Sequence, residues 1–260
     1  MGYLLSLFIA TAAIFASLYH LDQGPERLWD FVAFAMVVGG TIAVAAVVLP
    51  WSNSKAMFKY LKKLMIYWQP SKKAFIQKSL SVLQNFSLGH SNINFNLNTI
   101  EDQLLSDGLE LIHLDFKADE IEVILHERLQ SYLQTGKSIS NSFRSLAKYP
   151  PAFGLAGTVF GLVELMRAVS TGMPAQETGI KMAIALVATL YGLLMANLFI
   201  NPAGEAIEKI VNEEEKSGTL AIQSIMLIAQ GSNLLQAQEV LNSYVSVDER
   251  VNILQGEASA

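Results

Sequence analysis

The stretch Tyr149–Pro202, YPPAFGLAGTVFGLVELMRAVSTGMPAQETGIKMAIALVATLYGLLMANLFINP, decides the fold of this chain. It contains two apolar runs, 151–169 and 180–200, with a short polar stretch between them. A helix needs roughly 20 apolar residues to cross a bilayer, so each run predicts one membrane-spanning helix. The first run also carries a series of glycines, Gly154, Gly157 and Gly161. Glycines let membrane helices approach closely, so we predict a tightly packed helix.

The composition of the whole chain favours a membrane protein. Hydrophobic residues make up 52% and charged residues 16% of the sequence, and the mean hydropathy is +0.34, which is more apolar than an ordinary soluble domain. The chain has no cysteine, so disulfides and thiolate metal sites are excluded. Its net charge of -5 gives no indication of a nucleic-acid partner.

Two further apolar runs lie near the N-terminus, at 3–19 and 31–49. No Lys or Arg precedes the first run and no small-residue cleavage site follows it, so we interpret it as a retained helix rather than a signal peptide. The expected fold class is therefore an all-α membrane protein with four transmembrane helices in two pairs. The expected pairs are 3–20 with 31–50, and 151–171 with 180–201.

Lysine and arginine residues indicate how these helices are oriented. They are abundant in 51–149, whereas the two short loops, 21–30 and 172–179, carry only Arg27. The positive-inside rule then places both loops outside the cell and both termini in the cytoplasm. The expected domains are a first transmembrane pair (1–50), a cytoplasmic helical domain (51–149), a second transmembrane pair (150–202) and C-terminal cytoplasmic helices (203–260).

Helical periodicity runs through the predicted cytoplasmic parts. The stretch 54–68 has an apolar stripe opposite a lysine-rich face. This pattern suits either an amphipathic helix at the membrane surface or a solvated helix packed on its neighbours. Thr99 with Asp102 predicts the cap of a helix over 100–112. We also expect helices at 117–135, 203–230 and 232–245, and a loop at 86–98.

No motif of a soluble enzyme is present in the sequence. We find no Walker loop, no GxGxxG after a strand, no GxSxG elbow and no paired-histidine metal motif, so we expect no catalytic residue, cofactor or metal site. Charged residues inside a membrane helix mark ion pathways by default. Only the third helix carries them, as Glu164 and Arg167 near its outer end. For Glu164, an ion pair with Arg167, a role in ion uptake and a subunit contact remain open.

Without an acid at its centre, the membrane part of this chain offers oxygen atoms rather than a titrating group. The hydroxyls available are those of Thr158 in the third helix and Thr189 in the fourth. Threonine in a membrane helix often bonds only to its own backbone, which is the alternative interpretation of both residues. If the chain conducts protons, we expect the titrating carboxylate on another subunit.

Several segments resemble the MotA/PomA family of flagellar stator A subunits, within the MotA/TolQ/ExbB superfamily. PAFGLAGTVFGLVELM (151–166) looks like the third helix of that family, and MAIALVATLYGLLMANLFINPAGEAIEK (182–209) looks like its fourth helix with the cytoplasmic helix that follows. DFVAFAMVVGGTIAV (30–44) resembles its second helix, and GLELIHLDFKADEIEVILHERL (108–129) its cytoplasmic segment. ExbB and TolQ share the glycine and threonine pattern of the third helix, but the other segments and their order favour MotA/PomA.

This resemblance implies a motor component rather than an enzyme. It implies a homopentamer in the bacterial inner membrane, around two copies of a single-helix MotB/PomB-like B subunit that carries the membrane aspartate and an anchor to peptidoglycan. The complex would be an H+ or Na+ channel that powers flagellar rotation and motility. The alternative is an ExbB/TolQ-like ion-driven energiser that acts on a non-flagellar process.

The resemblance also assigns residues. By position, Thr158 and Thr189 match the ion-pathway threonines of the family. The residues expected at helix contacts, including the contact with the partner helix, are Pro151, Pro202, Gly154, Gly157 and Gly161. Ala188 departs from sodium-type members, which have a threonine there, whereas Thr158 favours sodium because it adds a hard oxygen. The ion therefore stays open between H+ and Na+.

A second departure concerns the contact with the flagellar rotor. In the family this contact uses an arginine followed shortly by a glutamate in the large cytoplasmic loop. Counted back from Gly108, the matching positions hold Leu88 and Asn96, so the expected charges are absent. The nearby charged residues that are candidates instead are Lys72, Lys73, Lys78, Glu101, Asp102 and Asp107.

Overall fold

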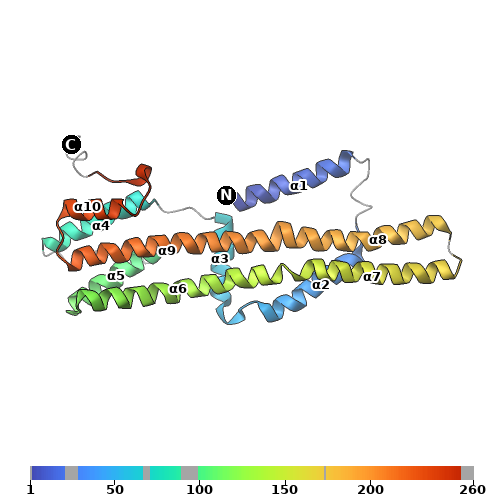
Figure 1. The fold of residues 1–260 in the computed structure, drawn as a ribbon, viewed down its shortest axis with the longest axis horizontal. Helices are drawn as coiled ribbons and strands as arrows, with labels where there is room; N and C mark the ends of the chain where they lie inside the picture. Colours follow the sequence, from blue (N-terminus) through green and yellow to red (C-terminus); the bar gives the residue numbers. More distant parts are fainter. Residues whose placement is uncertain (1, 21–28, 67–70, 89–98, 173, 253–260) are drawn as a thin grey trace. The chain divides into compact units, whose positions relative to one another are not determined.

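The structure is a computed structural model, and in its described part every regular element is a helix (Figure 1). The described residues are 2–20, 29–66, 71–88, 99–172 and 174–252. The chain divides into two compact units. Unit 1 comprises Met1–Tyr67 with Thr135–Lys209, and unit 2 comprises Trp68–Gln134 with Ile210–Ala260.

Unit 1 begins with two apolar helices, α1 (Gly2–His20) and α2 (Phe31–Val48). Asp30 caps α2, because its side-chain oxygen accepts a hydrogen bond from the backbone N–H of Ala33 at 2.6 Å. α2 ends before Pro50, as expected of a residue whose ring cannot continue a helix. The 3-10 turn η2 (Trp51–Asn53) and helix α3 (Ser54–Ile66) follow directly.

The central pair of unit 1 is α7 (Tyr149–Ser170) and α8 (Ala175–Leu194), which lie side by side with α2 packed against both (Figure 1). α7 begins with prolines in its first turn, where a missing backbone N–H breaks no helical hydrogen bond. α8 begins earlier than the predicted helix at 180. Its first turn contains Glu177, and a negative charge at a helix N-terminus is stabilising.

A π-helical turn, η3 (Met195–Ile200), joins α8 to the long helix α9 (Asn201–Ala229). Pro202 has no backbone N–H to donate, so the regular α-helical bonding fails next to it. The wider turn absorbs this break, and the backbone N–H of Asn201 bonds to the carbonyl of Ala196. The predicted helical extension over 203–230 is therefore confirmed.

Three helical stretches of the described part are long and apolar enough to cross a membrane. They are Phe31–Val48 and stretches within Ala118–Ser170 and Ala185–Ala229. The second, third and fourth expected spans each overlap one of these stretches. The first expected span forms α1, but its crossing of the membrane and the arrangement in two pairs stay predictions.

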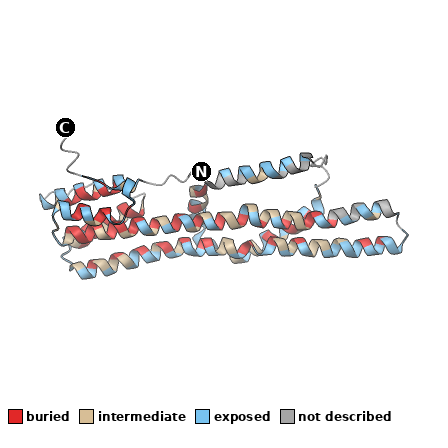
Figure 2. Ribbon diagram, turned by 45° about the horizontal axis from the view of Figure 1, so that its top comes forward, coloured by how far each residue is buried: buried red, intermediate tan, exposed pale blue. Residues whose placement is uncertain are grey.

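Unit 2 is built from α4 (Lys72–Ser87), α5 (Ile100–His113), α10 (Leu234–Asn242) and parts of α6 (Ala118–Leu146) and α9. Its core consists of fully buried aliphatic side chains, including Ile76, Leu104, Leu105, Ile121, Leu125, Ile222 and Ile225. Figure 2 shows such buried residues along the helices of this unit. The helices expected at 100–112, 117–135 and 232–245 are confirmed.

The sequence pattern does not indicate helix α4. Ser71 caps it by accepting a hydrogen bond from the backbone N–H of Ala74 at 3.4 Å. Phe75, Ile76 and Leu80 are buried along one face, but serines, lysines and glutamines interrupt the apolar pattern in the sequence. The loop expected from residue 86 is therefore wrong in its first residues, and 89–98 lie outside the described residues.

The close approach of α7 to α8 depends on glycines that face the other helix. A Cβ added at Gly154 would lie 2.8 Å from the backbone oxygen of Ala188 and 3.0 Å from Cα of Thr189. A Cβ at Gly157 would lie 2.7 Å from Cβ of Ala188, and one at Gly161 would collide with Ala185. These distances place Gly154, Gly157 and Gly161 against α8, and the expected contact with a partner helix stays a prediction.

Gly154→Ala is expected to destabilise unit 1 by about 1–3 kcal/mol, because the new methyl group would meet backbone atoms that cannot rotate away. The matched control is Gly179→Ala in the same helix pair, where the added methyl group meets nothing within 4 Å. That control should be neutral or slightly stabilising, since alanine favours helices. Thermal unfolding of the detergent-solubilised protein measures both, and equal melting temperatures would contradict the packing account.

Candidate ion pathway

Two threonine hydroxyls meet between α7 and α8. Oγ1 of Thr158 and Oγ1 of Thr189 lie 2.8 Å apart, within hydrogen-bond distance. Both hydroxyls also reach the carbonyl oxygen of Gly154, at 3.0 Å from Thr158 and 3.2 Å from Thr189. The structure thus brings together the two residues that the sequence analysis selects, and it adds a backbone oxygen.

The bond from Thr158 to Gly154 is the local backbone contact that the sequence analysis gives as the alternative. It does not account for the whole arrangement, because Thr189 reaches the same carbonyl from the opposite helix. Each hydroxyl has one proton and two lone pairs, so this group of oxygens keeps acceptor capacity for another partner. We call Thr158, Thr189 and the Gly154 carbonyl the oxygen cluster.

The oxygen cluster is neither sealed inside the helix pair nor openly exposed. Thr158 and Thr189 are both half-buried, whereas Gly154 and Ala188 are buried. Uncharged oxygens of this kind serve in selectivity filters and ion paths, where they replace part of the hydration shell of an ion. They do not titrate near neutral pH, so the cluster can line a path for a proton but cannot carry the proton itself.

An acidic residue and an aromatic group lie close to this part of α8. The backbone N–H of Asp30 donates a hydrogen bond to the hydroxyl of Tyr191 at 3.3 Å, and Tyr191 follows Thr189 by two positions. The ring of Tyr191 meets Phe34 edge-on with centroids 6.2 Å apart. The sequence pattern does not select Asp30, because it precedes an apolar run and has the position of a helix cap.

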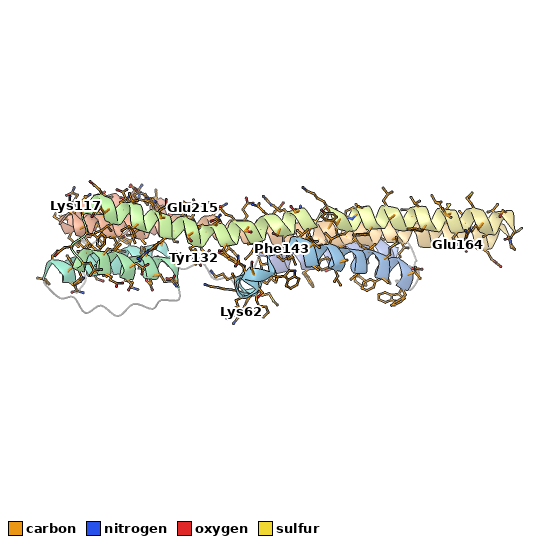
Figure 3. The ribbon with its side chains drawn as sticks, turned by 90° about the horizontal axis from the view of Figure 1, so that it is seen from below. Lys62, Lys117, Tyr132, Phe143, Glu164 and Glu215 are labelled. Carbon is orange, nitrogen blue, oxygen red and sulfur yellow. The ribbon has the colours of Figure 1, made fainter. Side chains whose placement is uncertain are left out.

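The charged residues of α7 follow Thr158 in the sequence and lie on the surface of the chain. Glu164 and Arg167 are both exposed, and Glu164 is labelled on α7 in Figure 3. An ion pair between them, and the other roles considered for Glu164, stay predictions.

The proline positions lie at the ends of the helix pair. A Cβ at Gly192 would collide with the carbonyl oxygen of Pro150 and would lie 3.0 Å from Cα of Pro151. The start of α7 is therefore pressed against α8 just before the π-helical turn. Pro202 follows that turn, and the contact roles expected of Pro151 and Pro202 stay predictions.

Most of the charged residues considered for the rotor contact form ion pairs inside unit 2. The pairs are Lys72 with Glu213 at 3.1 Å, Lys78 with Asp102 at 2.6 Å and Asp107 with Arg128 at 2.7 Å. Each pair joins two helices, so these charges have a structural role in the chain itself. Lys73 is exposed on α4. Leu88 is 66% exposed at the end of α4, and Asn96 lies outside the described residues.

Carboxyl groups are unusually buried in unit 2. Glu101, Asp102 and Glu214 have relative exposures of 6%, 8% and 7%. The hydroxyl of Tyr132 donates to Glu214 at 3.2 Å. Burial, more than the nearby Asp102 and Glu214 charges, raises the pKa of Glu101 above its ordinary value.

Glu101→Gln is expected to stabilise unit 2 at neutral pH. Because the pKa of Glu101 is raised in the folded chain, its ionisation above that pKa lowers the free energy of unfolding. Protonation of Glu101 restores this free energy of unfolding as the pH falls. The variant should melt about 2–4 °C above the unmodified chain at pH 7, the shift expected for about 1 kcal/mol. The difference in melting temperature between the variant and the unmodified chain should become smaller toward pH 5.

Glu110→Gln, an exposed position on the same helix, is the control for Glu101→Gln and should change little at either pH. Thermal melts of both variants across this pH range measure the effect. A Glu101→Gln variant that melts below the unmodified chain at pH 7 would show that the ionised carboxylate stabilises the fold.

Comparison with known proteins agrees with this geometry. Residues 96–218, which include both threonines, match the sequence profile of the MotA/TolQ/ExbB proton channel family. Motility protein A of Borreliella burgdorferi is 29% identical over 247 residues, covering 93% of this chain and 92% of that protein. Chemotaxis protein PomA of Vibrio alginolyticus is 22% identical, covering 85% of this chain and 86% of that protein.

The fold is also shared with a solved structure. The flagellar MotAB stator complex from Bacillus subtilis contains a chain that matches with a TM-score of 0.82 at 19% identity. The match covers 96% of this chain and 98% of that chain. The resemblance noted in the sequence is therefore confirmed along nearly its whole length. This chain is therefore similar to the MotA/TolQ/ExbB proton channel family over residues 96–218 and to its motility proteins over nearly its whole length.

Proposed function

We propose that this chain is the A subunit of an ion-driven flagellar stator. The observation that carries the proposal is the oxygen cluster, formed where two close-packed apolar helices face each other. Relatives that match over most of their length include a motility protein A and a chemotaxis protein PomA, which supports flagellar output over a non-flagellar energiser. The MotAB fold match supports the same assignment.

The proposed complex has further subunits because this chain lacks the acid that a proton path needs. The partner would be a MotB/PomB-like B subunit whose single membrane helix carries an aspartate next to the oxygen cluster. Large apolar side chains on α7 and α8 are exposed in the single chain, for example Phe160, Met166 and Leu186. A homopentamer around the B subunit, embedded in the inner membrane with cytoplasmic termini, would cover them.

The oxygen cluster would control the charge of the partner's aspartate. An ionised carboxylate in an apolar site is costly, and each hydrogen bond to a charged group returns about 1.5–3 kcal/mol. Hydroxyl groups of Thr158 and Thr189 would donate to the ionised form. When the aspartate takes up a proton, it would donate to one of the cluster oxygens instead. The oxygen cluster would thus bind both the ionised and the protonated form of the aspartate. The change between these two forms would favour a different chain of the ring as the one that faces the aspartate.

The transported ion in this proposal is H+ or Na+. The local packing bears on Ala188, which stands where sodium-type members have a threonine. Ala188 is buried and its Cβ covers Gly157. A threonine at this position would bring extra atoms into a contact that is already tight.

The rotor contact in this proposal would come from charges of unit 2. Lys72, Lys78 and Asp102 hold helices together within the chain. Lys73 is exposed on α4 beside them, so it is the first side chain to test.

Deletion of the gene is expected to leave cells with flagella that do not rotate. Expression of the unmodified chain should restore swimming, and co-expression with a B subunit whose membrane aspartate is replaced by asparagine should not. Swimming speed and filament staining measure these outcomes. Normal swimming after deletion, in a strain that has no second stator set, would overturn the assignment and favour the non-flagellar energiser.

Thr158→Ala should show whether this hydroxyl serves a sodium path. If sodium is the ion, swimming speed depends on the external sodium concentration and the variant needs several-fold more sodium for half-maximal speed. If the proton is the ion, speed does not depend on sodium. Thr158→Ser keeps the oxygen and is the matched control. A sodium-dependent motor whose sodium requirement is unchanged in Thr158→Ala would contradict a role of Thr158 in the path.

A further inference from the structure

The region that follows α2 has a marked charge asymmetry. No aspartate or glutamate occurs between Asp30 and Glu101. The same interval contains several lysines, which all lie between Lys55 and Lys78. Helix α3 follows α2 through the short turn η2, and α2 is one of the candidate membrane spans. A basic segment next to the cytoplasmic end of a span attracts anionic lipid headgroups.

Helix α3 has one face against the protein and a different face open. Tyr60 and Leu64 are buried, at 4% and 6% exposure, and α3 contacts α1. Lys55, Lys59 and Lys62 are exposed and follow one another at i, i+4 and i+7 on the helix surface. Figure 3 shows Lys62 on the side of α3 that is turned away from α7.

Exposed apolar side chains border this row of lysines. Phe58 is 71% and Met65 is 61% exposed, and their spacing of seven residues places them on one line along α3. A soluble helix would not gain from this arrangement. A helix in the headgroup region would, because its lysines reach phosphates while the neighbouring apolar side chains enter the acyl boundary.

The junction between α2 and α3 fixes the start of α3 next to the end of the candidate span. Trp51 is 55% exposed, and its indole N–H donates to the carbonyl of Ala46 in the last turn of α2 at 2.9 Å. This bond ties the start of α3 to the end of the candidate span. Tryptophan itself is enriched at the membrane interface.

We propose that α3 is a binding site for anionic phospholipid, with Lys55, Lys59 and Lys62 contacting headgroup phosphates and Phe58 and Met65 entering the acyl boundary. A second copy of the chain is a poorer occupant of this face, because its own α3 would present the same row of exposed lysines, Lys55, Lys59 and Lys62. The proposal requires that α2 crosses the membrane, but it does not depend on an ion path. It can therefore fail while the proposed stator function holds.

Trp51 provides a direct reporter of the lipid next to α3. The full chain with Trp29→Phe and Trp68→Phe, assembled with its partner where the complex requires it, would be reconstituted in bilayers of brominated phosphatidylglycerol or brominated phosphatidylcholine. Quenching of Trp51 fluorescence in mixtures of the two gives the relative affinity of the site. We expect a preference of about fivefold or more for phosphatidylglycerol, the effect of one lysine near an anionic surface. The preference should weaken as salt is raised.

The triple change Lys55→Gln, Lys59→Gln and Lys62→Gln should abolish the preference, and the same positions changed to Arg should keep it. The charge-matched control changes the exposed Lys73, Lys117 and Lys209 to Gln, and should keep the preference as well. Circular dichroism checks that each variant is folded. Equal quenching by both lipids in the unmodified site would overturn the proposal. Weak quenching by both would overturn it too, because a protein neighbour would then cover Trp51.

Discussion

The contact between α7 and α8 is the constraint on which the rest of unit 1 depends. Gly154, Gly157 and Gly161 present no side chain at this contact, so Ala185 and Ala188 pack directly on the opposite backbone. Membrane helices gain little from hydrophobic burial against lipid, and close van der Waals packing of this kind is what holds them together. The same proximity lets two threonine hydroxyls and one carbonyl oxygen share hydrogen bonds across the helix boundary.

Much of the fold could be predicted from the sequence because membrane helices have a strong apolar signal. The runs at 31–49 and 151–169 became α2 and α7 with small shifts at their ends. α4 was missed, because its buried Phe75, Ile76 and Leu80 are separated by polar residues and only the packing of unit 2 makes them a core face. The π-helical turn was also not predictable, since a proline near a helix junction permits several adjustments.

The candidate site was predictable in its side chains but not in its backbone. Thr158 and Thr189 stand out in the sequence as oxygens inside apolar helices, and the structure joins them. The carbonyl of Gly154 leaves no trace in a sequence, because every residue has one. The charges of unit 2 show the opposite problem. Lys72 looks like a free surface charge in the sequence, but its partner Glu213 lies 141 positions away.

Ion flux through the assembled A and B subunits in proteoliposomes tests the central claim most directly. Thr189→Val replaces the hydroxyl by a methyl group of nearly the same shape, and Thr189→Ser keeps the oxygen. The account predicts that flux, measured with a pH- or sodium-sensitive dye under an imposed gradient, falls at least about tenfold in Thr189→Val, the loss expected for a hydrogen bond worth about 1.4 kcal/mol. Thr189→Ser should retain most of the flux. Unchanged flux in a fully assembled Thr189→Val complex would contradict the claim that the oxygen cluster lines the path.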